Sequence, residues 1–132
     1  FIPTLNQVIE YDGRHWHKDN QAGDEKKIKI ALSNNLNIFR VRQSPLKKII
    51  TEDIVVPETF NGKKYVDLVL QNILQLHSDN LTQRHKEKIK NYLASSATKC
   101  DRKLERYIDE LLKQKTAKHG KVAIREQNKK FQ

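Results

Sequence analysis

The sequence predicts an α/β domain in which a small mixed β-sheet is flanked by helices, followed by a basic helical extension. Two observations indicate this. Residues 7–56 carry the patterns of a strand, a helix and two further strands in that order, and the first three elements have the length of a βαβ unit. After Gly62 the apolar residues recur only with the helical period. We therefore expect an α/β core over residues 1–58 and a basic helical region over residues 59–132.

The first strand is predicted over residues 7–13, where β-branched and apolar side chains precede a closing Gly13. Residues 1–6 are expected to be extended chain that ends in a turn. Residues 14–23 are polar and aromatic, which predicts a loop after the strand.

The next elements follow from changes of period. From Asp24 the apolar residues fall on one helical face, and this helix should end near Asn34 and Asn35, because asparagine tolerates the left-handed backbone that ends helices. Residues 37–42 alternate apolar and basic side chains, as in a strand with one solvent-exposed face. This strand and the first would be parallel neighbours joined by a right-handed crossover. Residues 54–56 predict a further short strand.

Three amphipathic helices are expected after Gly62. The third would be N-capped by Asp101 or Thr98, and residues 120–132 are expected to form a partly ordered tail. The apolar stripes consist of Tyr65, Val66, Val69, Leu70 and Ile73 in the first helix, Leu81, Ile89, Tyr92 and Leu93 in the second, and Leu104, Tyr107, Ile108, Leu111 and Leu112 in the third.

The composition favours a protein that binds a polyanion. The 132 residues carry a net charge of +10, and most of the excess lies after residue 58. Nucleic acid is the commonest polyanion, although a solubilising surface has the same composition. There is no signal peptide pattern and no apolar run of the roughly 20 residues that a membrane span needs. The single cysteine, Cys100, excludes a disulfide framework. We expect a cytoplasmic protein of prokaryotic or phage type, with DNA as its partner, no membrane contact, and a homodimer as an open alternative.

A pair of carboxylates on the first strand is the main chemical signal. Glu10 and Asp12 are two residues apart, so both project from one face near the C-terminal end of the strand. Two like charges side by side are costly unless a cation neutralises them, and carboxylate oxygens suit Mg²⁺ or Mn²⁺. We therefore predict that both are catalytic residues and metal ligands. An E-x-D pair at an exposed strand end also arises often by chance.

Two histidines follow within a few residues. A histidine that titrates near neutrality can accept a proton from an attacking water. His17 is therefore the preferred general base, and His15 is the second choice. Asp19 and Asp24 offer further carboxylates, although Asp24 can equally cap the helix. Trp16 can simply fill the core. No third histidine or cysteine lies close enough in sequence to support a structural zinc site.

Basic side chains are predicted to contact nucleic acid. Arg40 and Arg42 share one face of their strand, and they either approach a scissile phosphate or pair with Asp12 or Asp24. Arg14 lies in the loop beside the histidines. The second C-terminal helix can follow a DNA backbone, giving salt-sensitive binding, or can simply cover the sheet. Its basic residues are Arg84, Lys86, Lys88 and Lys90.

Together these residues resemble the core of very-short-patch-repair-like endonucleases of the PD-(D/E)XK superfamily, whose relatives include phage homing endonucleases. That family has an IEYDG…WH strand and loop, a helix, and a strand ending in R-V-R. The stretches that carry the resemblance are VIEYDG at residues 8–13, Trp16 with His17, Asp24 with Lys27, and NIFRVR at residues 37–42. They lie within residues 1–56, less than half of the chain. The resemblance implies a restriction-endonuclease-like fold.

The resemblance also implies a metal-dependent DNA endonuclease that hydrolyses the phosphodiester bond through a metal-activated water. His17 matches the family's catalytic histidine, and Lys27, His15 and Asp24 would be accessory residues. There are two departures. Asp12 replaces the lysine of the PD-(D/E)XK pattern, and the first acidic residue would lie on a strand upstream of this chain. The chain is therefore expected to be a fragment or to have an incomplete site.

Two other functions remain open from the sequence. A non-catalytic nucleic-acid-binding protein can keep the same fold without its first acidic residue. A protein-interaction module can use the basic helices to dock an acidic partner. Cleavage of DNA with Mg²⁺ or Mn²⁺, binding of DNA without cleavage, and absence of both distinguish the three.

Overall fold

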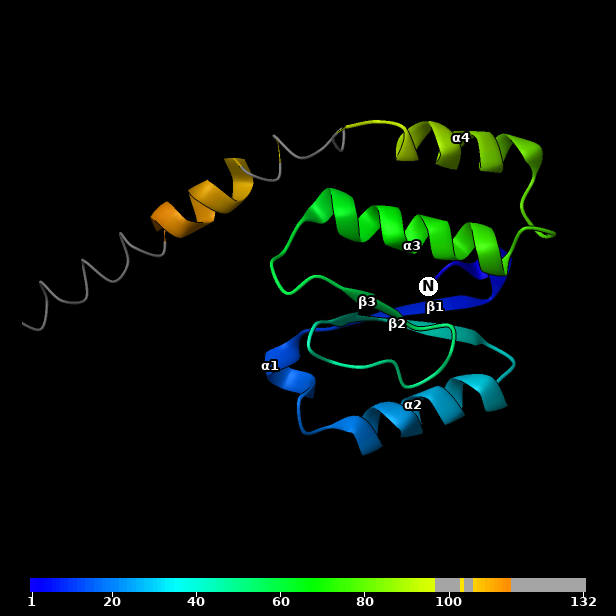
Figure 1. Cartoon of the computed structure of the whole chain (residues 1–132), viewed down its shortest axis with the longest axis horizontal. Helices are drawn as coiled ribbons and strands as arrows, with labels where there is room; N and C mark the ends of the chain where they lie inside the picture. The colour runs from blue at the N-terminus through cyan, green and yellow to red at the C-terminus, as the bar shows by residue number, and fades with distance from the viewer. Residues whose placement is uncertain (97–102, 104–105, 115–132) are drawn as a thin grey trace, which may run out of the picture. The chain divides into compact units, whose positions relative to one another are not determined.

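The structure is a computed structural model that describes residues 1–96, 103 and 106–114 (Figure 1). The chain divides into two compact units, residues 1–96 and residues 97–132. The first unit extends to Ser96, beyond the division expected at residue 58, because the helix after Gly62 packs on the sheet. No helix in the described part of the chain is both long and apolar enough to cross a membrane.

A three-stranded parallel sheet forms the centre of the first unit. Its strands are β1 (Gln7–Asp12), β2 (Asn37–Gln43) and β3 (Ile54–Val56), in the order β1-β2-β3. All three described strands are parallel, whereas a mixed sheet was expected. The α/β class and the parallel pairing of the first two strands are confirmed. The register places Glu10 opposite Arg40 and Asp12 opposite Arg42.

The chain enters the sheet through a short 3₁₀ turn, η1 (Pro3–Leu5), instead of the extended segment expected there. Ile2 forms an antiparallel bridge with Gln7, and Asn6 adopts a left-handed conformation with φ 48°. The proline fixes the backbone angle that starts the turn. The chain thereby reverses direction just before β1, which confirms the expected turn but not the extended chain.

One face of the sheet is covered by α1 (Arg14–His17) and α2 (Gln21–Ser33) (Figure 1). The loop expected over residues 14–23 is therefore wrong, because most of it is helical. The second helix begins three residues before Asp24, so Asp24 lies in its first turn, not at its N-cap. It ends as predicted, with Asn35 in the left-handed region at φ 57°. Its apolar side chains pack on β2 in a small core of Ile28, Ala31 and Ile38.

The other face is covered by α3 (Gly62–Leu76), beside which lies α4 (Gln83–Leu93) (Figure 1). Both helices start at polar caps: the side chain of Asn61 accepts a hydrogen bond from the backbone N–H of Lys64, and that of Thr82 from His85. The main core lies between α3 and the sheet. Its buried residues are Leu5, Phe39, Val41, Val56, Tyr65 and Ile73.

Because helices cover both of its faces, β2 is buried almost throughout. Phe39 and Val41 join the core under α3, while Arg40 and Arg42 project to the opposite face under α1 and α2. The expected solvent-exposed face is therefore wrong. Arg40 is 0% exposed and Arg42 is 3% exposed. Burial of these two cations requires acidic partners, and those partners form the candidate site.

The described part of the second unit is helical at Lys103 and over residues 106–114. This agrees with the third helix expected from the apolar stripe. Its expected caps, Asp101 or Thr98, and the expected tail at residues 120–132 lie outside the described residues.

Candidate metal centre

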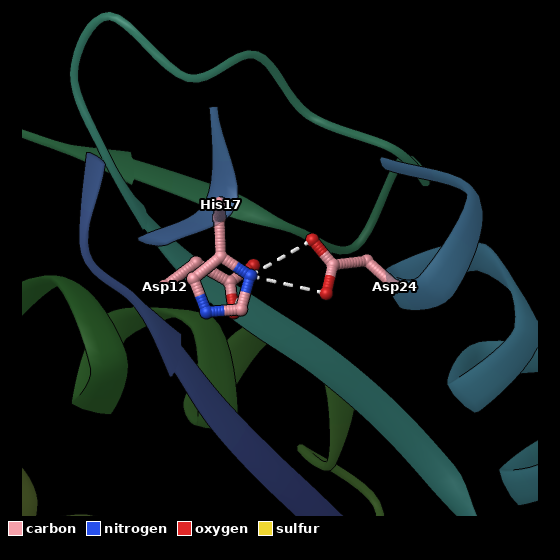
Figure 2. A group of neighbouring side chains, drawn as sticks. All are labelled: Asp12, His17 and Asp24. Carbon is pink, nitrogen blue, oxygen red and sulfur yellow. Dashed lines mark hydrogen bonds and ion pairs between the residues drawn. The ribbon is translucent and has the colours of Figure 1, made fainter. Parts of the chain in front are cut away.

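Three side chains converge at the C-terminal end of β1 (Figure 2). Asp12 is the last residue of the strand, His17 ends α1, and Asp24 lies in the first turn of α2. The short α1 turns the chain back over the sheet, so that His17 lies between the two aspartates. Its Nδ1 is 3.0 and 3.1 Å from the two carboxylate oxygens of Asp24 and 3.6 Å from Oδ1 of Asp12.

These three residues are close enough to share a metal ion. One donor atom from each, Nδ1 or a carboxylate oxygen, lies within 4.8 Å of the other two. Both aspartates are 0% exposed, whereas His17 is partly exposed, so the group opens to solvent on the histidine side. Within the described residues no other group of this kind contains three His, Cys, Asp or Glu side chains.

Arg40 and Arg42 lie directly against the two aspartates. Arg40 binds Asp12 through Nε at 2.7 Å and Nη2 at 2.6 Å, and the same Nη2 is 3.0 Å from Oδ1 of Asp24. Arg42 Nη1 is 3.0 Å from Oδ2 of Asp12 and 3.5 Å from Oδ2 of Asp24. Two guanidinium groups therefore bridge the two carboxylates. The pairing of these arginines with aspartates, one of the two expected alternatives, is what the structure shows.

Glu10 joins this network as a partly exposed carboxylate. Its Oε2 is 2.7 Å from Arg40 Nη1, an ion pair without hydrogen-bond geometry, and 3.9 Å from the ammonium of Lys27. Glu10 and Asp12 thus project from the same face of β1, as the strand period predicts. However, the group able to share an ion combines Asp12 with His17 and Asp24, not with Glu10.

The electrostatics of Arg40 follow from its burial among acids. Burial by itself lowers the pKa of a guanidinium, but the hydrogen bonds to Asp12 and the charges of Asp12, Glu10 and Asp24 outweigh burial and raise the pKa of Arg40 above its ordinary value. Arg40 is therefore a permanent cation. It holds three carboxylates in one place that would otherwise repel one another.

A second set of contacts fixes α1 on the sheet. The side-chain carbonyl of Gln43, the last residue of β2, accepts a hydrogen bond from the backbone N–H of Arg14 at 3.1 Å. The Gln43 amide donates to the backbone carbonyl of Glu58 at 2.6 Å. Arg14 itself forms an ion pair with Glu58. Arg14, which was expected to contact nucleic acid, is thus engaged within the chain, where it anchors the helix that carries His17.

The other residues expected at the site lie around it. His15 is exposed on α1 and Asp19 is exposed between α1 and α2, and neither belongs to the group able to share an ion. Trp16, which could have filled the core, is 85% exposed. The basic residues of α4 do not share one face of that helix: Arg84 and Lys88 are one turn apart on one side, and Lys86 and Lys90 are one turn apart on another.

Sequence reasoning missed Asp53, which is 0% exposed. Its carboxylate accepts hydrogen bonds from the backbone N–H groups of Arg40 at 2.9 Å, Ile49 at 2.8 Å and Ile50 at 3.1 Å. It fastens the segment before β3 to the strand that carries both arginines. The available signal was an aspartate immediately before a short strand, where such residues commonly bind nearby backbone N–H groups.

Comparisons with protein-family models, with characterised proteins and with solved structures found no match to this chain. The case for a function therefore rests on the site.

The donor set fits a divalent cation. Carboxylate oxygens and an imidazole nitrogen are both common ligands of divalent metal ions. Around an octahedral ion with bonds of about 2.1 Å, adjacent ligands lie about 3 Å apart and opposite ligands about 4.2 Å apart. The donor atoms here all lie within 4.8 Å of one another, so a small rearrangement would bring them round one ion. Asp12, Asp24 and His17 would hold the ion. The two arginines already neutralise the two aspartates, so an ion would compete with them.

Proposed function

We propose that this chain carries the metal centre of a nuclease that hydrolyses phosphodiester bonds in DNA, with a restriction-endonuclease-like arrangement of its sheet and helices. The observation that carries the proposal is the convergence of Asp12, His17 and Asp24 at the C-terminal end of a parallel strand, with Glu10 on the same face. Ligands commonly bind beyond the carboxyl ends of parallel strands. The resemblance of the same residues to very-short-patch-repair-like endonucleases supports the assignment.

Each side chain has a role that its contacts support. Asp12, Asp24 and the Nδ1 atom of His17 would hold Mn²⁺ or Mg²⁺, which would polarise a phosphodiester and lower the pKa of a bound water. Bound in this way, His17 would be a ligand and not the expected general base, because its Nδ1 faces the aspartates. Glu10, whose side chain is 33% exposed, can orient the attacking water.

Lys27 supports the same proposal. The PD-(D/E)XK pattern places a lysine where this chain has Asp12. In the fold, the ammonium of Lys27 on α2 lies 3.9 Å from Oε2 of Glu10 and is largely exposed. A cation beside Glu10 can contact a phosphate oxygen or a water bound there. Lys27 can therefore supply from a helix what the missing strand lysine would supply.

Cleavage of supercoiled plasmid DNA with MnCl₂ or MgCl₂, compared with excess EDTA, tests the proposal. The informative variants are Glu10→Gln and Asp24→Asn. The matched control is Asp19→Asn, which alters an exposed carboxylate between α1 and α2. We expect metal-dependent nicking that both site variants abolish and the control retains. Nicking that persists in EDTA, or that Asp24→Asn leaves intact while the protein stays folded, would rule the proposal out.

A second function is favoured by one observation, the neutralisation of Asp12 and Asp24 by Arg40 and Arg42. A site already balanced in charge can serve as a purely structural ion-pair network in a DNA-binding protein without catalysis. Such a protein would bind duplex DNA with the same affinity in MnCl₂ and in EDTA, and would leave the plasmid uncut.

A further inference from the structure

Each guanidinium group bridges the carboxylates of Asp12 and Asp24 through one nitrogen, and Nε of Arg40 also donates to Oδ2 of Asp12 at 2.7 Å. Nη2 of Arg40 lies 2.6 and 3.0 Å from the two Oδ1 atoms. Nη1 of Arg42 lies 3.0 and 3.5 Å from the two Oδ2 atoms. A divalent cation that joins both carboxylates must use oxygens that one of these two nitrogens already contacts.

Arg40 makes too many contacts to be displaced from the aspartates by an ion. Besides the bridging Nη2, its Nε donates to Asp12 at 2.7 Å and its Nη1 lies 2.7 Å from Glu10. Its backbone N–H is bound by Asp53. Displacing Arg40 would leave a fully buried cation without its counter-charges, which is among the most costly changes in a protein interior.

Arg42 is held more loosely. Arg42 contacts the aspartates through Nη1 alone, at distances longer than those of Arg40 Nη2. Its Nε, like Nη1 of Arg40, is buried without a hydrogen-bond partner among the described residues. An unpaired buried N–H carries a desolvation cost that the guanidinium recovers when it moves to a new acceptor. Oδ2 of Asp24, which Arg42 Nη1 contacts at 3.5 Å, also lies 3.0 Å from Nδ1 of His17, whereas the Asp12 oxygen 3.6 Å from the same Nδ1 is Oδ1. The third donor of the candidate metal centre therefore lies next to the position of Arg42 Nη1.

We infer that Arg42 is an internal substitute for the metal ion: it occupies the Oδ2 side of the Asp12–Asp24 pair, and a divalent cation binds there only by displacing it. This inference rests on the proposed function and concerns the regulation of the same site. Without metal the two aspartates are already neutralised by the guanidinium groups, and the affinity for the ion is reduced by the free energy needed to release the Arg42 guanidinium. Once released, the guanidinium is available to a phosphodiester oxygen.

Calorimetric titration of the full chain with MnCl₂ tests the inference, and the fluorescence of Trp16 gives a second readout. Trp16 is the only tryptophan and is the neighbour of His17, so Mn²⁺ bound at this centre quenches it. Neither readout depends on cleavage. The variants are Arg42→Gln and, in case that protein does not fold, Arg42→Lys. Lys27→Gln is the matched control, because it removes one positive charge that contacts Glu10 but not the aspartates.

We expect Arg42→Gln to bind Mn²⁺ at least about tenfold more tightly than the natural chain, the smallest effect usual for removing a close buried charge from a pair. The Mn²⁺ affinity of Arg42→Lys should lie between those of the natural chain and Arg42→Gln. The Lys27→Gln control should gain less than about fivefold, as for an exposed ion pair. A gain in Arg42→Gln no larger than in Lys27→Gln would overturn the inference and leave the metal centre standing. Failure of the natural chain and every Arg42 variant to bind Mn²⁺ would overturn the proposed function as well.

Discussion

Arg40 binds the carboxylate of Asp12 through two parallel contacts, Nε to Oδ2 at 2.7 Å and Nη2 to Oδ1 at 2.6 Å, and both side chains are 0% exposed. Two such contacts fix the orientation of both groups. The pair joins β1 to β2 at the edge where the candidate metal centre lies. The same side chains therefore stabilise the sheet and shape the site.

Asp12→Asn should destabilise the fold. The amide keeps the shape of the carboxylate but removes its charge, and breaking a buried ion pair costs about 3–5 kcal/mol. Urea unfolding followed by circular dichroism measures the change. Asp19→Asn, on the exposed segment between α1 and α2, should change the free energy of unfolding by less than about 0.5 kcal/mol. Equal stabilities of the two variants would contradict a structural role for the Asp12–Arg40 pair.

His17→Ala should weaken Mn²⁺ binding by more than about tenfold, because even residues that only support a ligand usually account for that much affinity. His15→Ala, which alters an exposed histidine on the same short helix, should bind Mn²⁺ like the natural chain. Calorimetric titration measures both. If His17→Ala binds Mn²⁺ normally but no longer cleaves DNA, His17 is the general base and not a ligand.

The basic residues of α4 should act as two separable pairs if this helix contacts DNA. Arg84 and Lys88 lie on one side of α4, and Lys86 and Lys90 lie on another. A straight DNA backbone can follow only one side. Replacing the contacting pair by glutamine should reduce the slope of log K against log salt by about 1.8, the value for two duplex phosphate contacts. Replacing the other pair should leave the slope unchanged. Equal slopes for both double variants would exclude a one-sided contact.

Stability should fall at alkaline pH because of Tyr65. Burial raises the pKa of its hydroxyl, the neighbouring Tyr11 raises it further, and the hydroxyl donates to the backbone carbonyl of Pro57. The folded state therefore resists ionisation. The contribution of Tyr65 to the free energy of unfolding is fully present below the pKa of an unfolded tyrosine, about 10, and is lost as pH rises through the raised pKa of the folded state. Tyr65→Phe should remove this part of the alkaline loss, measured by urea unfolding between pH 8 and about 11. If Tyr65→Phe has the same pH dependence of stability as the natural chain, Tyr65 does not cause the alkaline loss.

Much of the backbone could be predicted because its signals are local. The bounds of β1, β2 and β3 follow within a residue from alternation and from the flanking Gly13 and Pro57. The end of α2 follows from the tolerance of Asn35 for the left-handed region. The early start of α2 and the presence of α1 were missed, since polar and aromatic residues such as those at 14–23 carry no periodic apolar signal.

The candidate site was predictable only in part. That Glu10 and Asp12 share a face follows from the strand period alone. That Asp24 and His17 join Asp12, while Glu10 pairs with Arg40 and Lys27, depends on how α1 and α2 fold over the sheet. For Arg40 and Arg42 the sequence left open whether they meet phosphate or aspartate. In this structure the register of β1 against β2 places both arginines beside Asp12, so they pair with aspartate.

The sequence by itself determined most of the elements and the residue types that can hold a cation, because backbone period, turn residues and side-chain chemistry are properties of neighbours along the chain. The tertiary structure alone decided which charges are buried together. Arg42 meets Asp24 only when a helix crosses the sheet to bring residues 18 positions apart into contact, and burial there makes each charge depend on its partner. Which charges pair across the fold depends on the three-dimensional arrangement of the helices and strands, and no local sequence pattern encodes it.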